Sequence, residues 1–279
     1  MQNFVNFCQK NQANINTVFI SDLHLPIDKP VTDNLLGQAF LGLLDKLLLL
    51  PNLQNLYILG DWFDAWLGDD VAQTFDFQQN FAKMLQKLTQ LSQKNCQILV
   101  MIGNRDFLLG QGFCDMFGAK LIKEPYCINL KQPNTQRKVR LEHGDKLCTD
   151  DKNYQRFAKI IQNPLSKQLL LSLSQAKRQQ IAHKLRQKSR SDTAKKPVSI
   201  MDVNADAVNK VLASVDILLH GHTHRPKLHL DAFGKKKRLV LGDWRVIDKH
   251  VEAVIAVMQR VTVQNCQPND QIDLIQFTY

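Results

Sequence analysis

Glycine, proline and paired cysteine are scarce in this sequence. The 279 residues include 12 glycines and 9 prolines, which excludes collagen-like and loop-dominated chains. The six cysteines form no CxxC pair and no zinc-ribbon spacing, so we expect free thiols in a reducing cytosol. They are Cys8, Cys96, Cys114, Cys127, Cys148 and Cys266. A chain of this length, 44% hydrophobic, is expected to build a core without disulfides.

The sequence also lacks a targeting segment and a membrane span. Residues 1–16 are polar and contain no signal-peptide core. The richest apolar run, residues 41–50, is interrupted by Asp45 and Lys46. It is shorter than the ~18 apolar residues that a spanning helix needs. We therefore expect a cytoplasmic protein, either free or bound to a membrane surface.

Acidic residues are too few to balance the basic ones. Lysine and arginine number 36 against 26 aspartates and glutamates, which gives a net charge of +10. Such an excess indicates an anionic partner: nucleic acid, a membrane surface or a phosphorylated ligand. Residues 152–196 contain twelve basic residues and one acidic residue, Asp192, so this segment carries +11 and the rest of the chain carries −1. The excess therefore belongs to one local segment.

Strand-like and helix-like segments alternate along the chain, which predicts an α/β fold. Strands are expected at 17–20, 56–59, 98–102, 139–142 and 216–219, with several more in 238–279, and helices at 34–50, 76–95 and 202–213. Residues 1–16 are expected to form a tail, and residues 17–279 a single domain. The basic, glycine-free segment at about 151–197 is expected to be a helical insertion in that domain.

Five of the expected strands are followed by residues of the types that bind metals. The clusters are SDLH at 21–24, GDWFD at 60–64, GNRD at 103–106, HGD at 143–145 and HGHTH at 220–224. Sites in open α/β sheets form beyond the carboxyl ends of the strands. Any one of these clusters is common as a turn or a cap. Five in this order, each after an apolar strand, indicate one shared metal site.

The spacing and the donor types within the clusters suit coordination. Asp22 and His24 are two residues apart, as are His222 and His224, so on extended backbone each pair projects to one side. Imidazole and oxygen donors without thiolate suit Mn²⁺, Fe or Zn²⁺. The clusters offer seven candidate ligands, which is more than one metal ion needs if it keeps coordination positions open for substrate. They are Asp22, His24, Asp61, Asn104, His143, His222 and His224. The pattern therefore favours two metals that share one carboxylate.

This pattern resembles that of the calcineurin-like metallophosphoesterases, which runs DxH, GDxxD, GN[HR][DE], HGD and GHxH. The resemblance covers residues 17–145 and 198–245. It implies a four-layer α/β/β/α sandwich and in-line attack of metal-activated water on phosphorus. By position, it implies one metal held by Asp22, His24, Asp61 and His224, and a second held by Asp61, Asn104, His143 and His222. The residues it implies in catalysis are Asp61, Asn104, Arg105 and His143.

Arg105 stands where many members of that family have a histidine that is usually regarded as the general acid. Arginine stays protonated at neutral pH and cannot donate a proton, but it grips phosphate with two N–H groups. An alkoxide leaving group needs an acid, whereas phosphate leaves as a stable anion. Arg105 therefore favours a pyrophosphate over an alkyl phosphomonoester as substrate. The alternative is that Arg105 merely pairs with Asp106.

Longer motifs and the basic insertion carry a closer resemblance. They resemble the family of UDP-2,3-diacylglucosamine pyrophosphatases of lipid A synthesis, over nearly the whole chain beyond residue 16. The motifs are FISDLHL, GDWFDAWLGDD, GNRDFLLG, EHGDKLCTDD, SIMDVN and HGHTHRP. This resemblance implies hydrolysis of UDP-2,3-diacylglucosamine to UMP and 2,3-diacylglucosamine 1-phosphate with Mn²⁺, at the cytoplasmic face of a Gram-negative inner membrane. It implies substrate contacts by Asn104, Arg105, Asp151, Ser189, Thr193, Lys196 and His222.

The insertion combines leucine and isoleucine with many lysines and arginines. Basic amphipathic helices suit anionic membrane surfaces or acyl-bearing ligands. Tracts that stack nucleic-acid bases are rich in aromatics, and residues 152–196 have only Tyr154 and Phe157. We expect a lipid-linked UDP-sugar and an anionic membrane surface as partners, with no nucleic acid and no obligate protein partner. The plain alternative is a solvated charged face over helices packed on the core.

Two other functions stay open at this point. One is another dinuclear-metal phosphodiesterase that acts on nucleotides or nucleic acid, which predicts activity on water-soluble diesters without lipid. The other is a non-enzymatic scaffold on the same fold. A scaffold is expected to lack metal ligands, and all seven are present in this sequence.

Overall fold

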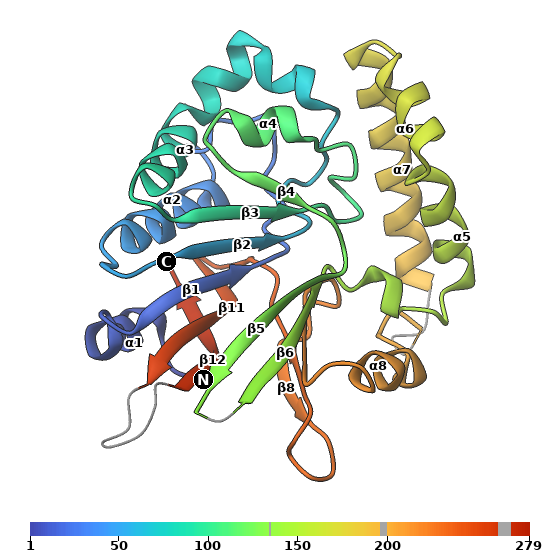
Figure 1. Cartoon of the computed structure of the whole chain (residues 1–279). Helices are drawn as coiled ribbons and strands as arrows, with labels where there is room; N and C mark the ends of the chain where they lie inside the picture. Colours follow the sequence, from blue (N-terminus) through green and yellow to red (C-terminus); the bar gives the residue numbers. More distant parts are fainter. Residues whose placement is uncertain (134, 196–199, 262–268) are drawn as a thin grey trace.

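Two β-sheets packed face to face form the centre of the molecule, with helices on both outer sides (Figure 1). The computed structural model describes residues 1–133, 135–195, 200–261 and 269–279, and only the backbone of residues 188–195. The seven-stranded sheet has the order β10-β11-β1-β2-β3-β4, with β12 paired to β11. Its strands are β1 (Ile15–Ile20), β2 (Asn55–Leu59), β3 (Gln97–Met101), β4 (Lys120–Ile122), β10 (Arg245–Ile247), β11 (His250–Val261) and β12 (Asn269–Thr278).

The second sheet has five strands in the order β5-β6-β7-β9-β8. They are β5 (Tyr126–Gln132), β6 (Thr135–Glu142), β7 (Ile217–His220), β8 (Lys227–Leu230) and β9 (Lys237–Val240). β1 to β4 run parallel in the first sheet, and β6, β7 and β9 run parallel in the second. The carboxyl ends of the parallel strands in each sheet therefore share one edge, which is where sites form in such folds.

Alternating side chains build three separate cores between four layers. Val18 and Ile20 of β1 pack under the helices, whereas Phe19 faces the space between the sheets. In the second sheet, Leu219 of β7 joins the core around Phe19, and Leu218 packs against the helix beyond. Strands with apolar residues on both faces are expected when both faces are covered. The predicted α/β/β/α order of layers is confirmed.

Helices cover the outer face of each sheet. Against the first sheet lie α1 (Phe4–Asn11), α2 (Leu35–Leu48), α3 (Phe75–Gln93) and α4 (Gln111–Asp115), and against the second lies α8 (Ala205–Leu212). Two short 3₁₀ turns are η1 (Asp69–Gln73) and η2 (Asp145–Leu147). Side-chain caps start the helices: Asn34 accepts the Gly37 N–H at 2.7 Å at the start of α2, which satisfies a donor that the helix leaves unpaired.

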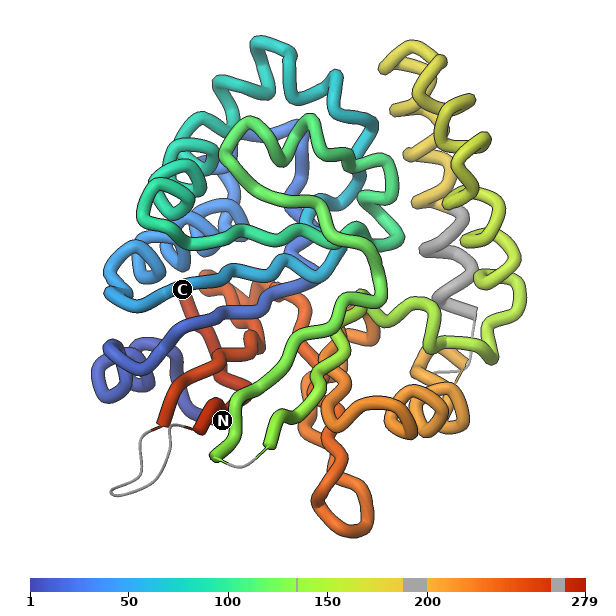
Figure 2. Tube along the Cα trace, viewed as in Figure 1, coloured from blue at the N-terminus to red at the C-terminus, as the bar shows by residue number. Residues whose placement is uncertain are grey.

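Three helices between β6 and α8 stand beside this body (Figure 2). They are α5 (Lys152–Ile161), α6 (Pro164–Leu171) and α7 (Gln175–Lys195), and we call them the lid. Asp151 caps α5 by accepting the Tyr154 N–H at 3.1 Å, and Asn163 caps α6 next to Pro164. The basic segment is therefore helical, as its glycine-free pattern predicts.

The N-terminal segment differs from the predicted tail. Residues 4–11 form α1, whose start is capped by Asn3 through a 2.9 Å bond from the Val5 N–H. Phe4 and Phe7 are buried, and the Phe4 ring lies 6.1 Å from the ring of Phe277 on β12. The tail prediction is wrong because an Asn cap followed by two phenylalanines three residues apart makes a short amphipathic helix that docks on the sheet.

Candidate metal centre

Five loops that follow parallel strands carry the predicted ligands to one place. The loops after β1, β2 and β3 come from the first sheet, and those after β6 and β7 from the second. Backbone bonds join the first two loops: the Asp22 N–H donates to Gly60 at 3.1 Å, and the His24 N–H donates to Asp61 at 3.0 Å. Sheet topology therefore assembles residues as far apart in the chain as Asp22 and His224.

One group of ligand-type atoms is formed by Asp22, His24 and His224, whose donor atoms all lie within 4.8 Å of one another. His24 Nε2 is 3.4 Å from His224 Nε2, and His224 Nε2 is 3.5 Å from Asp22 Oδ1. His24 Nδ1 is 3.9 Å from Asp61 Oδ2. These four are the residues that the resemblance implied for one metal.

A second group is formed by Asp22, Asp61 and His143, again within 4.8 Å. His143 Nε2 is 3.7 Å from Asp61 Oδ1, 3.0 Å from Asn104 Oδ1 and 3.2 Å from His222 Nδ1. All seven predicted ligands are thus connected through contacts of less than 4 Å. Asp22 belongs to both groups, and Asp61, a member of the second, also lies 3.9 Å from His24 Nδ1 of the first. Two carboxylates therefore lie where a bridging ligand is expected.

The backbone at these ligands is strained. Positive φ angles of 51° to 69° occur at Asp22, His24, Asp61, His222 and His224. Residues other than glycine rarely adopt this left-handed region, and each instance costs about 1–3 kcal/mol. Close packing adds to the constraint: a Cβ on Gly103 would lie 2.2 Å from Asp61 Oδ1, and one on Gly221 would lie 2.2 Å from Asp22 Oδ2. Strain concentrated at one site indicates that function fixes these backbones.

Two histidines are oriented by partners on their far side. His143 Nδ1 contacts the Leu59 carbonyl oxygen at 3.0 Å, so its Nε2 points into the centre. His224 Nδ1 lies 3.3 Å from Asp243 Oδ2. Such contacts set the tautomer and raise the basicity of a metal ligand. The sequence interpretation missed Asp243, although another Gly-Asp pair after an apolar run, LVLGD, was a usable signal.

The buried charges of the centre fit a divalent metal. Asp22 and Asp61 are at most 2% exposed, and burial, together with the carboxylates of Asp106 and Asp22, raises the pKa of Asp61. Burial lowers the pKa of His24 to about 3 and that of His222 to about 4, whereas the carboxylates of Asp61 and Asp22 raise the pKa of His143 against the effect of its burial. A metal binds the neutral imidazole, so a bound cation would release the proton of His143.

Orphaned polar atoms give the same indication. Within the described residues, the buried atoms Asp22 Oδ1 and His24 Nδ1 make no hydrogen bond. Buried polar atoms without a partner are costly and rare. Both atoms belong to the first group of ligands, and a cation bound between them would satisfy them.

Arg105 lies beside this centre and does not pair with Asp106. Its Nη1 donates to Asp64 Oδ1 at 2.9 Å, and its Nε lies 3.6 Å from Asp61 Oδ2. Asp106 is fully buried and accepts the N–H groups of Gly103 and Trp62 at 2.6 and 2.8 Å. The alternative interpretation of Arg105 is therefore wrong: Asp106 is occupied in joining the loops after β2 and β3.

The other predicted substrate contacts come from the lid. Asp151 lies at the start of α5, and Ser189 and Thr193 lie on α7, where only the backbone is described. Lys196 falls outside the described residues. Near the base of the lid, Tyr154 donates from its hydroxyl to Asp145 at 2.7 Å, and its ring lies 6.0 Å from that of His222. The base of the lid thus reaches the metal centre.

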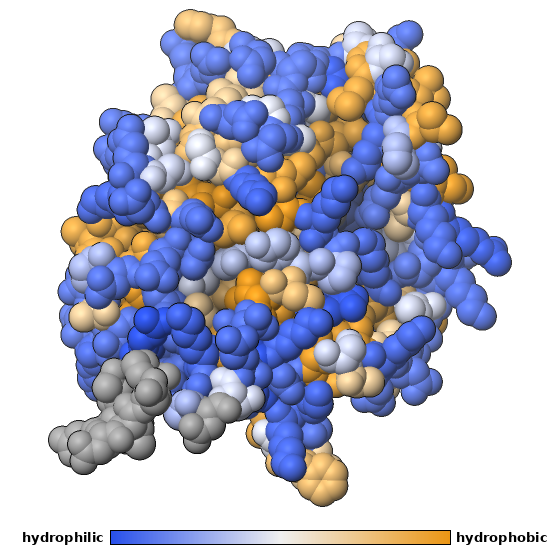
Figure 3. Space-filling model, in the orientation of Figure 1, coloured by the Kyte–Doolittle hydropathy of each residue, from blue (hydrophilic) through white to orange (hydrophobic). Residues whose placement is uncertain are grey.

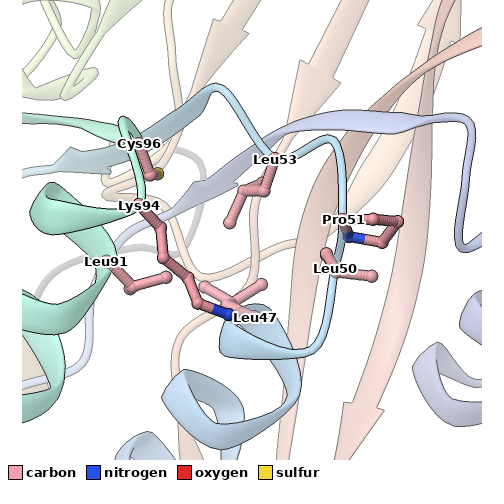
Figure 4. A pocket seen from close by; sticks show the side chains of 7 residues that line it. All are labelled: Leu47, Leu50, Pro51, Leu53, Leu91, Lys94 and Cys96. Atoms are coloured by element: carbon pink, nitrogen blue, oxygen red, sulfur yellow. The ribbon is translucent and has the colours of Figure 1, made fainter.

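A cavity of about 260 Å³ lies away from this centre (Figure 4). Its lining includes Leu47 in the last turn of α2 and Leu50 just after it, and Leu91 in the last turn of α3 with Lys94 and Cys96 just after it. These residues precede β2 and β3, so the cavity lies at the edge of the sheet opposite to the ligands. It holds none of the predicted site residues, and we assign the chemistry to the metal centre.

Comparisons with known proteins agree with this geometry. The family described as calcineurin-like phosphoesterase matches residues 15–226. The UDP-2,3-diacylglucosamine hydrolase of Pseudomonas entomophila is 43% identical over 231 residues, which cover 81% of this chain and 90% of that protein. The UDP-2,3-diacylglucosamine hydrolase of Pseudomonas aeruginosa is 42% identical over 235 residues, which cover 82% and 91%.

Among solved structures, Zn²⁺-bound Vps29 from Entamoeba histolytica aligns with 93% of this chain and 98% of its own at 15% identity and a TM-score of 0.36. That similarity is too low to support an argument. The family match is different in kind, because it spans most of the chain and includes all seven predicted ligands. The chain therefore belongs to the calcineurin-like phosphoesterase family, a family of metal-dependent hydrolases.

Proposed function

We propose that this protein hydrolyses the pyrophosphate bond of UDP-2,3-diacylglucosamine and releases UMP and 2,3-diacylglucosamine 1-phosphate. The observation that carries the proposal is the 42–43% identity to UDP-2,3-diacylglucosamine hydrolases over 81–82% of the chain. Arg105 beside the metal centre supports it independently. An arginine at this place suits an anhydride, because the departing phosphate needs no proton donor.

The proposed ligands are those that the resemblance implied. Asp22, His24, Asp61 and His224 would hold one divalent metal, and Asp61, Asn104, His143 and His222 the other. Bound metals lower the pKa of a water molecule and neutralise the charge that develops on phosphate oxygens. We propose Mn²⁺ as the native ion, since imidazole and oxygen donors without thiolate suit it.

The remaining chemistry belongs to the side chains around the centre. Arg105 would bind a phosphate oxygen with its guanidinium fork and hold the diphosphate in line for attack. Asn104 and His143, as proposed ligands, would keep the reacting phosphoryl group beside the metal that they hold. The proposed contacts to the rest of the substrate are Asp151, Ser189, Thr193, Lys196 and His222.

We further propose that the lid, at about 151–197 within a single domain of residues 17–279, captures the acylated substrate at a membrane surface. Its exposed apolar side chains include Phe157, Ile160, Leu165 and Leu169, and apolar residues are visible on the upper right of the molecule (Figure 3). In the described chain, no helix has the length and apolar content to cross a bilayer. We therefore propose peripheral binding at the cytoplasmic face of the inner membrane.

One assay tests the proposed function. Purified protein with Mn²⁺ is incubated with UDP-2,3-diacylglucosamine, with UDP-glucose and with a single-stranded DNA substrate, and UMP or nucleotide release is measured. We expect UMP from the acylated sugar alone, because only that substrate has acyl chains for the exposed apolar side chains of the lid. Equal release from all three would contradict the proposal and favour a general phosphodiesterase.

A further inference from the structure

Asp64 is shared by two arginines that come from different parts of the fold. Its Oδ1 accepts a 2.9 Å hydrogen bond from Arg105 Nη1, on the loop after β3. Its Oδ2 forms an ion pair with Arg186 Nη2, on α7 of the lid. The three side chains are partly shielded, with exposed fractions of 23%, 38% and 35% for Asp64, Arg105 and Arg186. One carboxylate therefore joins the core to the lid.

This cluster lies next to the reaction centre. The Arg105 N–H donates to Asp61 Oδ1 at 2.9 Å, and Arg105 Nε lies 3.6 Å from Asp61 Oδ2. Asp64 is itself fixed, because its N–H donates to the Leu25 carbonyl oxygen at 3.0 Å. The guanidinium group of Arg105 thus lies between Asp64 and the predicted ligand Asp61, and Asp64 is not itself a predicted ligand.

One donor in the cluster is unused, and Asp64 alone does not balance its two arginines. Arg105 also lies 3.6 Å from Asp61 Oδ2, a carboxylate whose charge the proposed metals would neutralise. Arg186 Nε is buried and makes no hydrogen bond within the described residues. A diphosphate diester carries two negative charges and several acceptor oxygens, and arginine binds such oxygens in a forked geometry. An anionic phosphate is therefore a suitable partner for these two arginines.

We propose that Asp64 is a positioning residue that holds Arg105 and Arg186 together, so that core and lid grip the substrate diphosphate at the same time. The identity of the diphosphate rests on the proposed function. Asp64 carries no reacting group. Its effect is to restrict the two side chains before substrate arrives, which lowers the entropy lost on binding.

A second ion pair between lid and core provides a matched control. Arg178 on α7 is 4% exposed and donates to Asp70 Oδ1 at 2.8 Å, and Gln175 donates to Asp70 Oδ2 at 3.1 Å. This pair anchors the same helix, and among the described residues it makes no hydrogen bond or ion pair with Arg105 or with a predicted ligand. Asp70→Asn should therefore show the effect of loosening the lid without disturbing Arg105.

The experiment compares the wild type with Asp64→Asn, Asp64→Glu and Asp70→Asn, all loaded with Mn²⁺. Hydrogen exchange of α7 reports lid docking, and UMP release from UDP-2,3-diacylglucosamine gives KM and kcat. We expect Asp64→Asn to raise KM at least tenfold with kcat within threefold. Asp64→Glu should restore most of that loss, because it keeps the charge. Asp70→Asn should speed exchange of α7 and change KM less than threefold.

Equal increases of KM in Asp64→Asn and Asp70→Asn would overturn the proposal, because Asp64 would then be an anchor only. A wild-type KM in Asp64→Asn would overturn it too. Calorimetric binding of UDP-glucose, a diphosphate diester without acyl chains, separates this proposal from the proposed function. If the wild type releases no UMP, the proposed function fails. The role of Asp64 is still supported if Asp64→Asn, but not Asp70→Asn, binds UDP-glucose tenfold more weakly than the wild type. No UDP-glucose binding by the wild type would overturn it.

Discussion

At the scale of single residues, the centre combines backbone strain with buried charge. Five predicted ligands hold positive φ angles, and each such angle costs about 1–3 kcal/mol. Two of them, Asp22 and Asp61, also bury a carboxylate, which is unfavourable without a cation nearby. These costs persist only if the surrounding loops and the bound metals compensate for them. Substitutions at residues that orient the ligands should therefore affect metal affinity directly.

Asp243→Asn should weaken Mn²⁺ binding by about 10–100-fold, the usual effect of removing the carboxylate behind a histidine ligand. Asp243 Oδ2 lies 3.3 Å from His224 Nδ1 and sets that ring. Isothermal titration with Mn²⁺ measures the change. Asp248→Asn is the control, because Asp248 is exposed and belongs to neither group of ligands. Equal affinities for the two variants would contradict the role given to Asp243.

Arg105→His should lower UMP release from UDP-2,3-diacylglucosamine about 10–100-fold, because a hydrogen bond to a charged group contributes about 1.5–3 kcal/mol. The rate of Arg105→Lys should lie between those of the wild type and Arg105→His, since lysine keeps the charge but cannot form the forked pair of hydrogen bonds. Hydrolysis of p-nitrophenyl phosphate is measured in parallel. Unchanged cleavage of the pyrophosphate, with p-nitrophenyl phosphate equally good in both forms, would contradict the argument that Arg105 serves an anhydride.

At the scale of elements, the helices and strands of the body are positioned by the faces they bury. Central strands such as β1 bury both faces, so their side chains alternate between two cores. α1 shows how few residues suffice: Phe4 and Phe7 lie on one side of a helix of eight residues and dock it on β12. A helix this short is not stable alone, so its packing on the sheet must stabilise it.

Phe4→Ala should lower the free energy of unfolding by about 3 kcal/mol, the lower end of the range for a buried phenylalanine. Phe4 is 0% exposed. Val5→Ala is the control within the same helix, because Val5 is 38% exposed and such surface changes stay within about 0.5 kcal/mol. Urea unfolding followed by circular dichroism measures both. Similar values for the two variants would mean that α1 contributes nothing to stability.

At the scale of the whole molecule, charge and chemistry are separated. The predicted ligands lie on loops that follow strands of both sheets, whereas the +11 of residues 152–196 lies in and just beyond the lid. Exposed leucines on α6 accompany that charge, with Leu165 and Leu169 at 75% and 67%. Exposed apolar side chains beside basic ones suit an anionic bilayer, which attracts each basic residue by about 1 kcal/mol.

Replacing Lys152, Arg156 and Lys159 of α5 by glutamine should weaken binding to phosphatidylglycerol vesicles about 100-fold, from about 1 kcal/mol for each charge. These residues are exposed. The control replaces Lys10, Lys83 and Lys120, which are exposed away from the lid. Co-sedimentation with vesicles measures binding, and added salt should reduce it through screening. Equal loss in both triple variants would assign the effect to total charge rather than to the lid.

Local signals in the sequence determined most of the layers and the whole ligand set. Apolar strands such as residues 98–101 are recognisable alone, because periodicity reports burial. Asp22, His24, His222 and His224 follow such strands at a spacing of two. Parallel strands bring their carboxyl ends to one edge, so the convergence of these residues was predictable from their order in the chain.

Only the tertiary structure decided the contacts between distant segments. It pairs Arg105 and Arg186 with Asp64, while Asp106 accepts backbone N–H groups, and it places Asp243 behind His224. The physical reason is that charges pair through space, and the nearest carboxylate in the chain was already occupied by backbone N–H groups. Sequence alone predicted which residues do the chemistry, and the fold determined which residues hold them in place.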